Sequence, residues 1–288
     1  LESILNRGDK CAIIATDTSF PALHAAGISP DFVVSIDAQI YSYLHHLAIN
    51  DEEPIYVFGL SVPRCITVKA KKRILIAGSH PFSRIVAEAL GLLCFDSGRG
   101  NVTSAAIEVA KMIGIERIDT VGADFGYPSG KPYATGTYLY SLFAARSVRS
   151  SPLEAEMADI VFRDRNSRRE LRDGEIVYIP RIMDRYRAMT QDLLRLELKK
   201  RREDTTRTKI SWSSFLKHYL DRLEALPTIT SSITNYIGKL DGEERAVLST
   251  VLPSAMRYFA DSPDPVSAIV SSKRRIIEIC SHELRYGS

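Results

Sequence analysis

The first half of the chain alternates short apolar, β-branched runs with amphipathic helical patterns. Strands that alternate with helices are typical of a parallel sheet, so the pattern predicts an α/β fold with a mostly parallel sheet and helices on both faces. The predicted strands are residues 11–15, 31–36, 54–58, 73–77 and 117–121. The predicted helices between them are residues 19–26, 38–48, 80–90 and 102–113.

The helix at residues 102–113 has sequence signals at both ends. Asn101, Thr103 and Ser104 are possible N-caps ahead of its apolar positions. Gly114 follows the last apolar residue, at the position where a residue with positive φ often ends a helix. We therefore expect this helix to begin and end close to these residues.

The second half of the chain becomes entirely helical after one further strand. A helical pattern begins at Thr137, and Asp173-Gly174 predicts a turn into a strand that ends near Ile179. After Pro180 no strand pattern of similar strength returns, so we predict a domain of residues 1–183 and a helical C-terminal domain of residues 184–288. The predicted C-terminal helices are residues 184–203, 212–226, 229–240, 243–259 and 264–282.

Composition narrows the class of protein. The chain is 45% hydrophobic and 25% charged, and no apolar run approaches the roughly 20 residues that span a bilayer, so we expect a soluble protein without a membrane partner. A net charge of +3 is too small to indicate nucleic acid as a partner, and we expect the basic run at residues 199–202 to be a solvated helix face. The first residue is Leu1 and not Met, so we expect part of the protein to lie before it.

The four cysteines predict no metal site. They are far apart, lack a CxxC pair, and three of them lie in apolar runs, which indicates buried thiols in a reducing, cytoplasmic compartment. These cysteines are Cys11, Cys65, Cys94 and Cys280.

Polar clusters follow four of the predicted strands. Ligands of open α/β sheets bind at the carboxyl ends of the strands, where loops and helix N-termini meet. The clusters therefore predict one binding cleft, with Asp17, Asp37, Gln39 and Ser79 among its binding residues. The four clusters are Thr16–Ser19, Ser35–Gln39, Gly78–His80 and Gly122–Phe125.

The segment from Asp96 to Ser104 is a glycine-bearing loop that opens directly onto a helix. Glycines let a backbone approach a ligand, and a helix N-terminus offers unpaired N–H groups that suit phosphate or carboxylate. The alternative is a plain glycine turn followed by an N-cap. Its candidate binding residues are Gly98, Gly100, Asn101, Thr103 and Ser104.

Asp124 is the strongest single candidate for a catalytic residue. It directly follows an apolar strand pattern and opens a loop rich in Gly and Pro, which is typical of an active-site loop and fits a lid that orders on binding. The alternative is that Asp124 caps a turn or pairs with Lys131. Together with Asp37 it can hold Mg²⁺ or a ribose hydroxyl. The other candidates on this loop are Gly122, Phe125, Lys131, Tyr133 and Gly136.

The histidines are weaker candidates. His24, His45, His46 and His218 fall inside helical patterns, where a surface or packed histidine is the common case. Only His80, beside Ser79 at a strand end, fits a ligand contact or a general base.

Five segments, taken in order, resemble the bacterial motility accessory factor family and the related archaeal hydroxymethyl-dihydropterin diphosphokinases. The resemblance covers about residues 1–180, and the helical tail carries no recognisable motif. The family usually shows a Gly-Pro-Ser-Leu turn, which Leu1 would follow, and many relatives have His where Tyr133 stands. The segments are Cys11–Asp17 (CAIIATD), Gly27–Asp37 (GISPDFVVSID), Gly98–Ser104, Gly122–Gly126 (GADFG) and Gly130–Gly136 (GKPYATG).

The resemblance implies a Rossmann-like domain similar to bacterial sialyltransferases, and two activities. Motility accessory factors are linked to the transfer of nonulosonic acids, which are sialic-acid-like sugars, from CMP donors to flagellin. The archaeal relatives move a diphosphate from ATP to a pterin alcohol with Mg²⁺. Fold alone does not choose between these reactions.

Three functions remain open at this point. In a glycosyltransferase the nucleotide phosphates would lie near Gly98–Ser104, Asp37 and Asp124 would hold hydroxyls or orient an acceptor, and Lys131 with Tyr133 would stabilise the leaving phosphate. In a diphosphokinase Asp37 and Asp124 would be Mg²⁺ ligands. The third possibility is a module without catalytic activity that binds a nucleotide or a partner protein, with the helical tail as a homo-oligomer interface.

Overall fold

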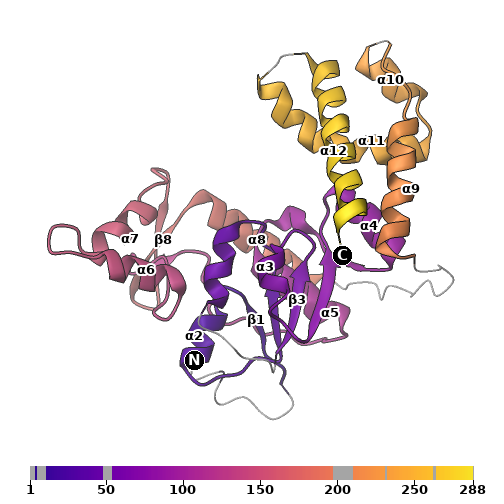
Figure 1. Cartoon of the computed structure of the whole chain (residues 1–288). Coiled ribbons are helices and arrows are strands. Elements are labelled where there is room, and N and C mark those ends of the chain that lie inside the picture. Colours follow the sequence, from indigo (N-terminus) through magenta and orange to yellow (C-terminus); the bar gives the residue numbers. More distant parts are fainter. Residues whose placement is uncertain are drawn as a thin grey trace. The chain divides into compact units, whose positions relative to one another are not determined.

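The computed structural model describes residues 4, 11–47, 54–196, 210–230, 232–261 and 264–287. The chain forms two compact units. Figure 1 colours the chain by position in the sequence. The α/β unit comprises Leu1–Ile76 and Phe95–Arg201, and the helical unit comprises Ala77–Cys94 and Arg202–Ser288. The division into domains of residues 1–183 and 184–288 stays a prediction.

The main sheet is parallel, as the sequence predicts. Its strand order is β1-β2-β3-β4-β5, with Ile14 of β1 paired to Phe32 of β2, and Val57 of β3 paired to Ile74 of β4. The predicted α/β fold, a mostly parallel sheet with helices and a helical C-terminal region, is confirmed. The strands are β1 Ile14–Thr16, β2 Phe32–Ser35, β3 Ile55–Gly59, β4 Arg73–Ala77 and β5 Leu93–Cys94.

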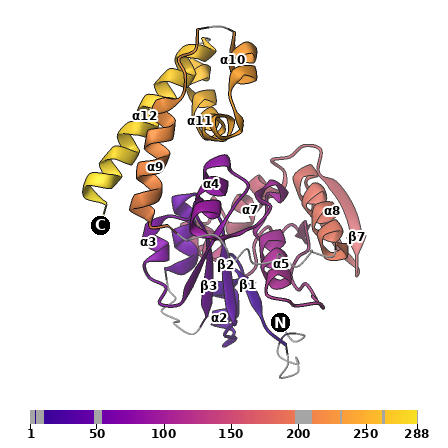
Figure 2. The same cartoon turned by 90° about the vertical axis from the view of Figure 1, so that its right-hand side faces the viewer.

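Apolar residues on both faces of the strands build the core of the α/β unit. Successive side chains of a strand point to opposite faces, so Val33 packs with one cluster and Val34 with the other. The first cluster includes Phe20 of α2 and Ile66 of α3, and the second includes residues of α5. Figure 2 shows these strands between α3 and α5. Helices of this unit are α2 Phe20–Ala25, η1 Ile40–His46 (a 3₁₀ helix), α3 Arg64–Thr67, η2 Ser97–Arg99, α5 Val102–Met112, α6 Tyr138–Arg146, α7 Leu153–Val161 and α8 Arg181–Arg195.

Helix α5 has the predicted ends and carries α8 on its outer side. The Asn101 side chain accepts a hydrogen bond from the Ser104 N–H at 2.8 Å, and Gly114 has a φ of 88°. Thr190 of α8 lies 2.9 Å from the Ser104 hydroxyl, and the Lys111 ammonium donates to the carbonyl of Leu193. The predicted helix at residues 184–203 therefore begins earlier, at Arg181, and packs within the α/β unit; residues 197–203 lie outside the described part.

The predicted strand at residues 117–121 is wrong. These residues, all in the described part of the chain, form no strand, and Val121 is 55% exposed. Arg117 and Asp119 pair with each other in solvent at 3.5 Å. β-branched residues favour a strand only where a neighbouring strand supplies hydrogen bonds and packing, and here that support is missing.

A small antiparallel sheet follows in the α/β unit, with the order β6-β8-β7. Its members are β6 Tyr127–Pro128, β7 Arg168–Arg172 and β8 Glu175–Ile179. The predicted Asp-Gly turn is confirmed, because Asp173 and Gly174 join β7 to β8 with φ angles of 49° and 84°. Both positive values match the turn that joins two strands with the normal twist.

The helical unit packs three long helices with α4. Tyr219 of α9 lies 2.6 Å from the buried Thr250 hydroxyl of α11, and its ring contacts Phe82 of α4 edge-on. Within the described residues no helix is both long and apolar enough to cross a membrane. Buried thiols were expected; Cys280 is buried, but Cys11 and Cys65 are exposed and Cys94 is half-buried, since apolar neighbours in sequence do not ensure burial. The helices are α4 Pro81–Leu90, α9 Trp212–Ala225, α10 Ile233–Lys239, α11 Gly242–Asp261 and α12 Pro265–Tyr286.

Candidate active site

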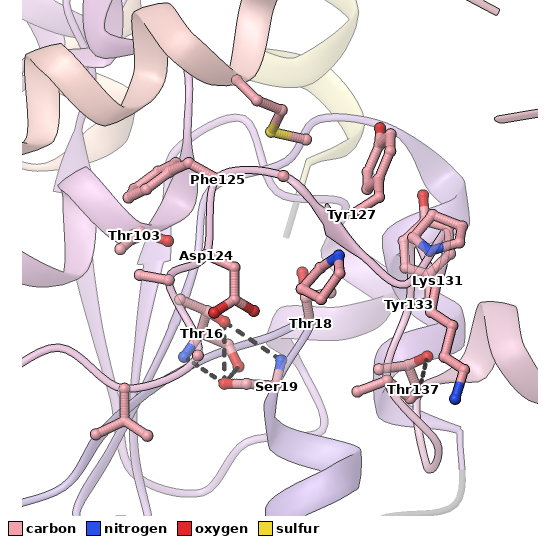
Figure 3. Close-up of a pocket in the computed structure, with 18 of the residues that line it drawn as sticks. Thr16, Thr18, Ser19, Thr103, Asp124, Phe125, Tyr127, Lys131, Tyr133 and Thr137 are labelled. Carbon is pink, nitrogen blue, oxygen red and sulfur yellow. Dashed lines mark hydrogen bonds between the residues drawn. The ribbon is translucent and has the colours of Figure 1, made fainter. Parts of the chain in front are cut away.

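A large open pocket of about 1430 Å³ lies in the α/β unit. The end of β1 with the turn after it, the start of α5, and the long segment from Ile115 to Thr137 all line this pocket. Figure 3 shows the Asp124 carboxylate directed toward the turn that contains Thr16 and Ser19. The pocket is thus built at the carboxyl end of a parallel strand and at a helix N-terminus, where ligands of α/β sheets bind.

The turn after β1 is a closed network of hydrogen bonds. The Ser19 hydroxyl donates to the Thr16 carbonyl at 3.0 Å, and the Thr16 hydroxyl donates to the Ser19 oxygen at 3.0 Å. The Ser19 oxygen also accepts the Thr16 N–H at 3.1 Å. Because each group restrains its neighbour, this side of the pocket is preorganised.

Asp17 belongs to this turn and is only 3% exposed. Its carboxylate accepts hydrogen bonds from the Ser35 hydroxyl at 2.6 Å, the Thr18 N–H at 2.8 Å and the Thr18 hydroxyl at 3.2 Å. Burial raises the pKa of Asp17, while these donors and the nearby His45 oppose the rise. Thr18 itself lines the pocket, so the hydrogen bonds of Asp17 hold a pocket-lining residue in place.

His45 of η1 belongs to the same group of side chains. Its ring lies edge-on to Tyr138 with centroids 4.5 Å apart, and its Nδ1 is buried without a hydrogen-bond partner among the described residues. Burial lowers the pKa of His45, and the charges of Asp17 and Asp37 oppose that change. The imidazole is therefore an uncharged neighbour of Asp17 near neutral pH.

The start of α5 forms another side of the pocket. Asn101, Val102 and Thr103 line the pocket. The N–H of Ser104 is bonded to the Asn101 cap, but those of Val102 and Thr103, the first two residues of the helix, have no acceptor within the helix. This end carries the positive end of the helix dipole, which suits an anion.

The loop after Asp124 is anchored to the small sheet. The Arg172 guanidinium donates to the Asp124 carbonyl at 2.8 Å, and the Ser129 N–H donates to the Ile176 carbonyl at 2.8 Å. A Cβ on Gly126 would approach Val177 to 2.7 Å, so only glycine lets the loop lie this close to β8. The predicted lid is therefore held at its start by β8 in this structure.

Two tyrosines on this loop face the pocket. Burial raises the pKa of Tyr133 and of Tyr127, and the charge of Arg163 opposes both changes. Both phenols therefore keep their proton near neutral pH and can donate a hydrogen bond to a ligand. Arg163 follows α7, whose last residue Val161 also lines the pocket.

The structure brings only some of the predicted site residues to the pocket. Asp17, Asp37, Gln39, Gly98, Gly100, Ser104 and Gly136 do not line it, although Asp17 touches it through Thr18. Asp37 is exposed and accepts the Gln39 N–H at 2.9 Å, and Ser79 belongs to the helical unit. The described residues include no ion pair between Asp124 and Lys131. Those that line the pocket are Asp124, Lys131, Tyr133, Asn101, Thr103, Gly122 and Phe125.

Several residues near the pocket were not expected from the sequence. Thr137 lines the pocket and is buried. Burial raises the pKa of the two pocket tyrosines and of Asp17; the charge of Arg163 opposes this rise for the tyrosines, and His45 opposes it for Asp17. The cluster Thr16–Ser19 did point to Thr18. No sequence signal separated His45 from an ordinary helical histidine, because its neighbours in space come from other strands and helices.

Comparison with known proteins identifies the first part of the chain. Residues 1–130 match the family model described as 6-hydroxymethylpterin diphosphokinase MptE-like. This part of the chain is similar to MptE-like domains. The match covers the main sheet, the start of α5 and Asp124, and it ends just before Lys131 and Tyr133, which also line the pocket.

Two further proteins are similar to this chain. An uncharacterized protein of Treponema pallidum (strain Nichols) is 37% identical over 172 residues, which are 58% of this chain and 61% of the relative. The structure of a MAf glycosyltransferase from Magnetospirillum magneticum AMB-1 matches 99% of this chain and 52% of that chain, with a TM-score of 0.51 and 14% identity. At this identity the likeness shows a shared fold. This chain spans about half to three fifths of the length of these two proteins.

Proposed function

We propose that the α/β unit is a nucleotide-sugar-dependent glycosyltransferase of the motility accessory factor type. The observation that carries the proposal is the pocket, which combines the end of β1, the start of α5 and the Asp124 loop. The fold shared with the MAf glycosyltransferase supports it. In this proposal the donor is a nonulosonic acid linked to CMP, and the acceptor is a protein such as flagellin.

Each side of the pocket has a distinct role in the proposed reaction. The N–H groups at the start of α5 and the Lys131 ammonium bind the donor phosphate, because both offer positive charge and hydrogen-bond donors. Tyr133 donates a hydrogen bond to the leaving phosphate as the glycosidic bond breaks. Asp124, whose carboxylate is directed into the pocket, orients the acceptor hydroxyl and accepts its proton (Figure 3).

The second candidate is an ATP- and Mg²⁺-dependent diphosphokinase, which the description of the matching family model favours. Asp37 and Asp124 would then hold the metal ion. Among the described residues no three His, Cys, Asp or Glu side chains come together as a ready metal site. Because Asp124 lines the pocket and Asp37 does not, this activity requires the substrate phosphates to supply most of the Mg²⁺ ligands.

Ligand-induced stabilisation distinguishes the two candidates. We expect CMP to raise the melting temperature without added metal, and we expect ATP to do so only with Mg²⁺ if the diphosphokinase is correct. Release of sialic acid from a CMP-linked sialic acid, followed by chromatography, then tests the transferase chemistry with water as acceptor. Absence of any effect of CMP, together with stabilisation by Mg²⁺-ATP, would replace the first proposal by the second.

The variant Asp124→Asn tests the assigned catalytic residue. Since the Asp124 side chain is exposed, we expect the melting temperature to stay within about 1 °C of the wild type, which corresponds to a small surface effect. We expect donor hydrolysis to fall by about 100-fold or more, because an amide cannot accept the proton. A large loss of stability with normal hydrolysis would show that Asp124 has a structural role.

A further inference from the structure

The hydroxyl groups on one side of the pocket all point their protons away from it. Thr18 donates to the Asp17 carboxylate at 3.2 Å, Ser19 donates to the Thr16 carbonyl at 3.0 Å, and Thr16 donates to the Ser19 oxygen at 3.0 Å. A hydroxyl has one proton and two lone pairs. Each of these three pocket-lining groups has therefore used its proton. The Ser19 oxygen has also used both lone pairs, on the N–H and the hydroxyl of Thr16, and the Thr16 hydroxyl has used one on the Ser19 N–H. Thr16 and Thr18 therefore keep lone pairs for a ligand, and Ser19 holds Thr16 in place.

The direction of these hydrogen bonds follows from their partners. A carboxylate or a carbonyl oxygen can only accept, so Thr18 and Ser19 must donate, and Thr16 must then donate to Ser19. Thr137, which also lines the pocket, donates in the same way to the Ala134 carbonyl at 2.8 Å. This side contrasts with the start of α5, where N–H donors are available.

We propose that Thr16 and Thr18 form an acceptor wall that binds the hydroxyl groups of a ribose or a sugar, that Ser19 orients Thr16, and that Asp17 fixes the polarity of the wall through Thr18. The inference rests on the proposed function and specifies how its substrate lies. A phosphate oxygen at neutral pH brings no proton to such a wall, so the phosphate is assigned to the start of α5 and Lys131 instead. A sugar or ribose hydroxyl brings the proton that the wall lacks.

Asp17 keeps this polarity only in its ionised form. An ionised carboxylate requires the proton of Thr18, whereas a protonated carboxyl would donate its own proton and free the Thr18 hydroxyl to donate into the pocket. Ser35 and the Thr18 N–H also donate to the carboxylate and so favour the ionised form. The other titratable groups that interact electrostatically with Asp17 or with its neighbour His45 are His45 itself, Asp37 and Tyr138.

The variant Thr18→Val removes the hydroxyl at nearly constant volume and tests the wall by ligand affinity. If the wall binds ribose, we expect Thr18→Val to weaken CMP roughly 3- to 10-fold and to leave 2′,3′-dideoxy-CMP unchanged, as measured by calorimetry. If it binds the transferred sugar, the loss appears with a CMP-linked sialic acid and not with CMP. Equal weakening of all three ligands, or no weakening of any, would overturn the inference. Thr67→Val, at a half-buried site on α3 that does not line the pocket, controls for the substitution itself.

A measurement without ligand separates failure of the wall from failure of the proposed function. A hydroxyl proton held by a buried carboxylate exchanges slowly with water, so we expect a resolved Thr18 hydroxyl signal in the NMR spectrum of the free protein. The signal should disappear in Thr18→Val and remain in Thr67→Val. Fast exchange at Thr18 would overturn the wall even if CMP binds. A slow Thr18 proton in a protein that binds no cytidine nucleotide would retain the wall and reject the transferase.

Discussion

The end of β1 and the segment of residues 115–124 line the same pocket but are held in opposite ways. At the end of β1, Asp17 is buried and bonded to Ser35 and Thr18. In the other segment Asp124 and Val121 are exposed, and Arg117 pairs with Asp119 in solvent. The first side is preorganised by its own buried hydrogen bonds, whereas the second is exposed and is held at the Asp124 carbonyl by the Arg172 guanidinium. In the proposed function the buried carboxylate of Asp17 supports the structure and the exposed carboxylate of Asp124 performs the chemistry.

The largest expected effect is the difference in unfolding free energy between variants that remove the Asp17 carboxylate and the Asp124 carboxylate. Asp17→Ala leaves the buried Ser35 hydroxyl without its acceptor, so we expect a loss of about 3 kcal/mol in the free energy of unfolding. Asp124→Ala, at the exposed position, should cost less than about 0.5 kcal/mol. Urea unfolding of both variants measures the difference. Equal losses would remove the contrast between the two sides of the pocket.

The next effect concerns His46, which is buried beside Tyr56 and Phe58. Burial, with smaller contributions from the charges of His45 and Lys69, lowers the pKa of His46 to about 4. The folded state therefore favours the neutral ring, and its stability is complete above the ordinary value of about 6.5 and falls as pH decreases toward 4. We expect His46 to account for a loss of about 2 to 3 kcal/mol over that range.

The variant His46→Phe isolates this contribution. It should reduce the slope of the unfolding free energy between pH 6.5 and pH 4, measured by urea unfolding at several pH values. Part of the slope should remain, because burial also lowers the pKa of His45. The surface variant His24→Phe serves as the control. An unchanged slope in His46→Phe would show that the imidazole is not buried as described.

The smallest effect distinguishes the two glycines that flank Asp124, Gly122 and Gly126. A Cβ on Gly126 would meet Val177 at 2.7 Å and the Tyr178 carbonyl at 3.1 Å, so Gly126→Ala should cost about 2 kcal/mol through overpacking against β8. Gly122 has a φ of 74° and open space around it, so Gly122→Ala should cost about 1 kcal/mol through backbone strain alone. Thermal unfolding of both variants compares them. A larger loss at Gly122 than at Gly126 would contradict the anchoring of the loop by β8.

Part of the candidate site could be predicted because its signals are local. Polar residues after a β-branched run marked the Thr16–Ser19 turn, and Asn101 was recognisable as a cap from the helical pattern that follows it. The Asp173-Gly174 turn was equally clear, because few residue pairs tolerate two positive φ angles. Whether these residues bind a ligand stays a prediction.

The sequence by itself determined the parallel sheet, because strands such as 32–35 and 55–59 are apolar on both faces and need cover on both. It also determined the ends of α5. Only the tertiary structure decided that residues 117–121 form no strand and that α8 packs on α5, because both depend on partners distant in the chain. Tertiary structure likewise decided that Asp17 is buried while Asp124 is exposed. Burial depends on what folds over a residue, and that information is not contained in its immediate neighbours.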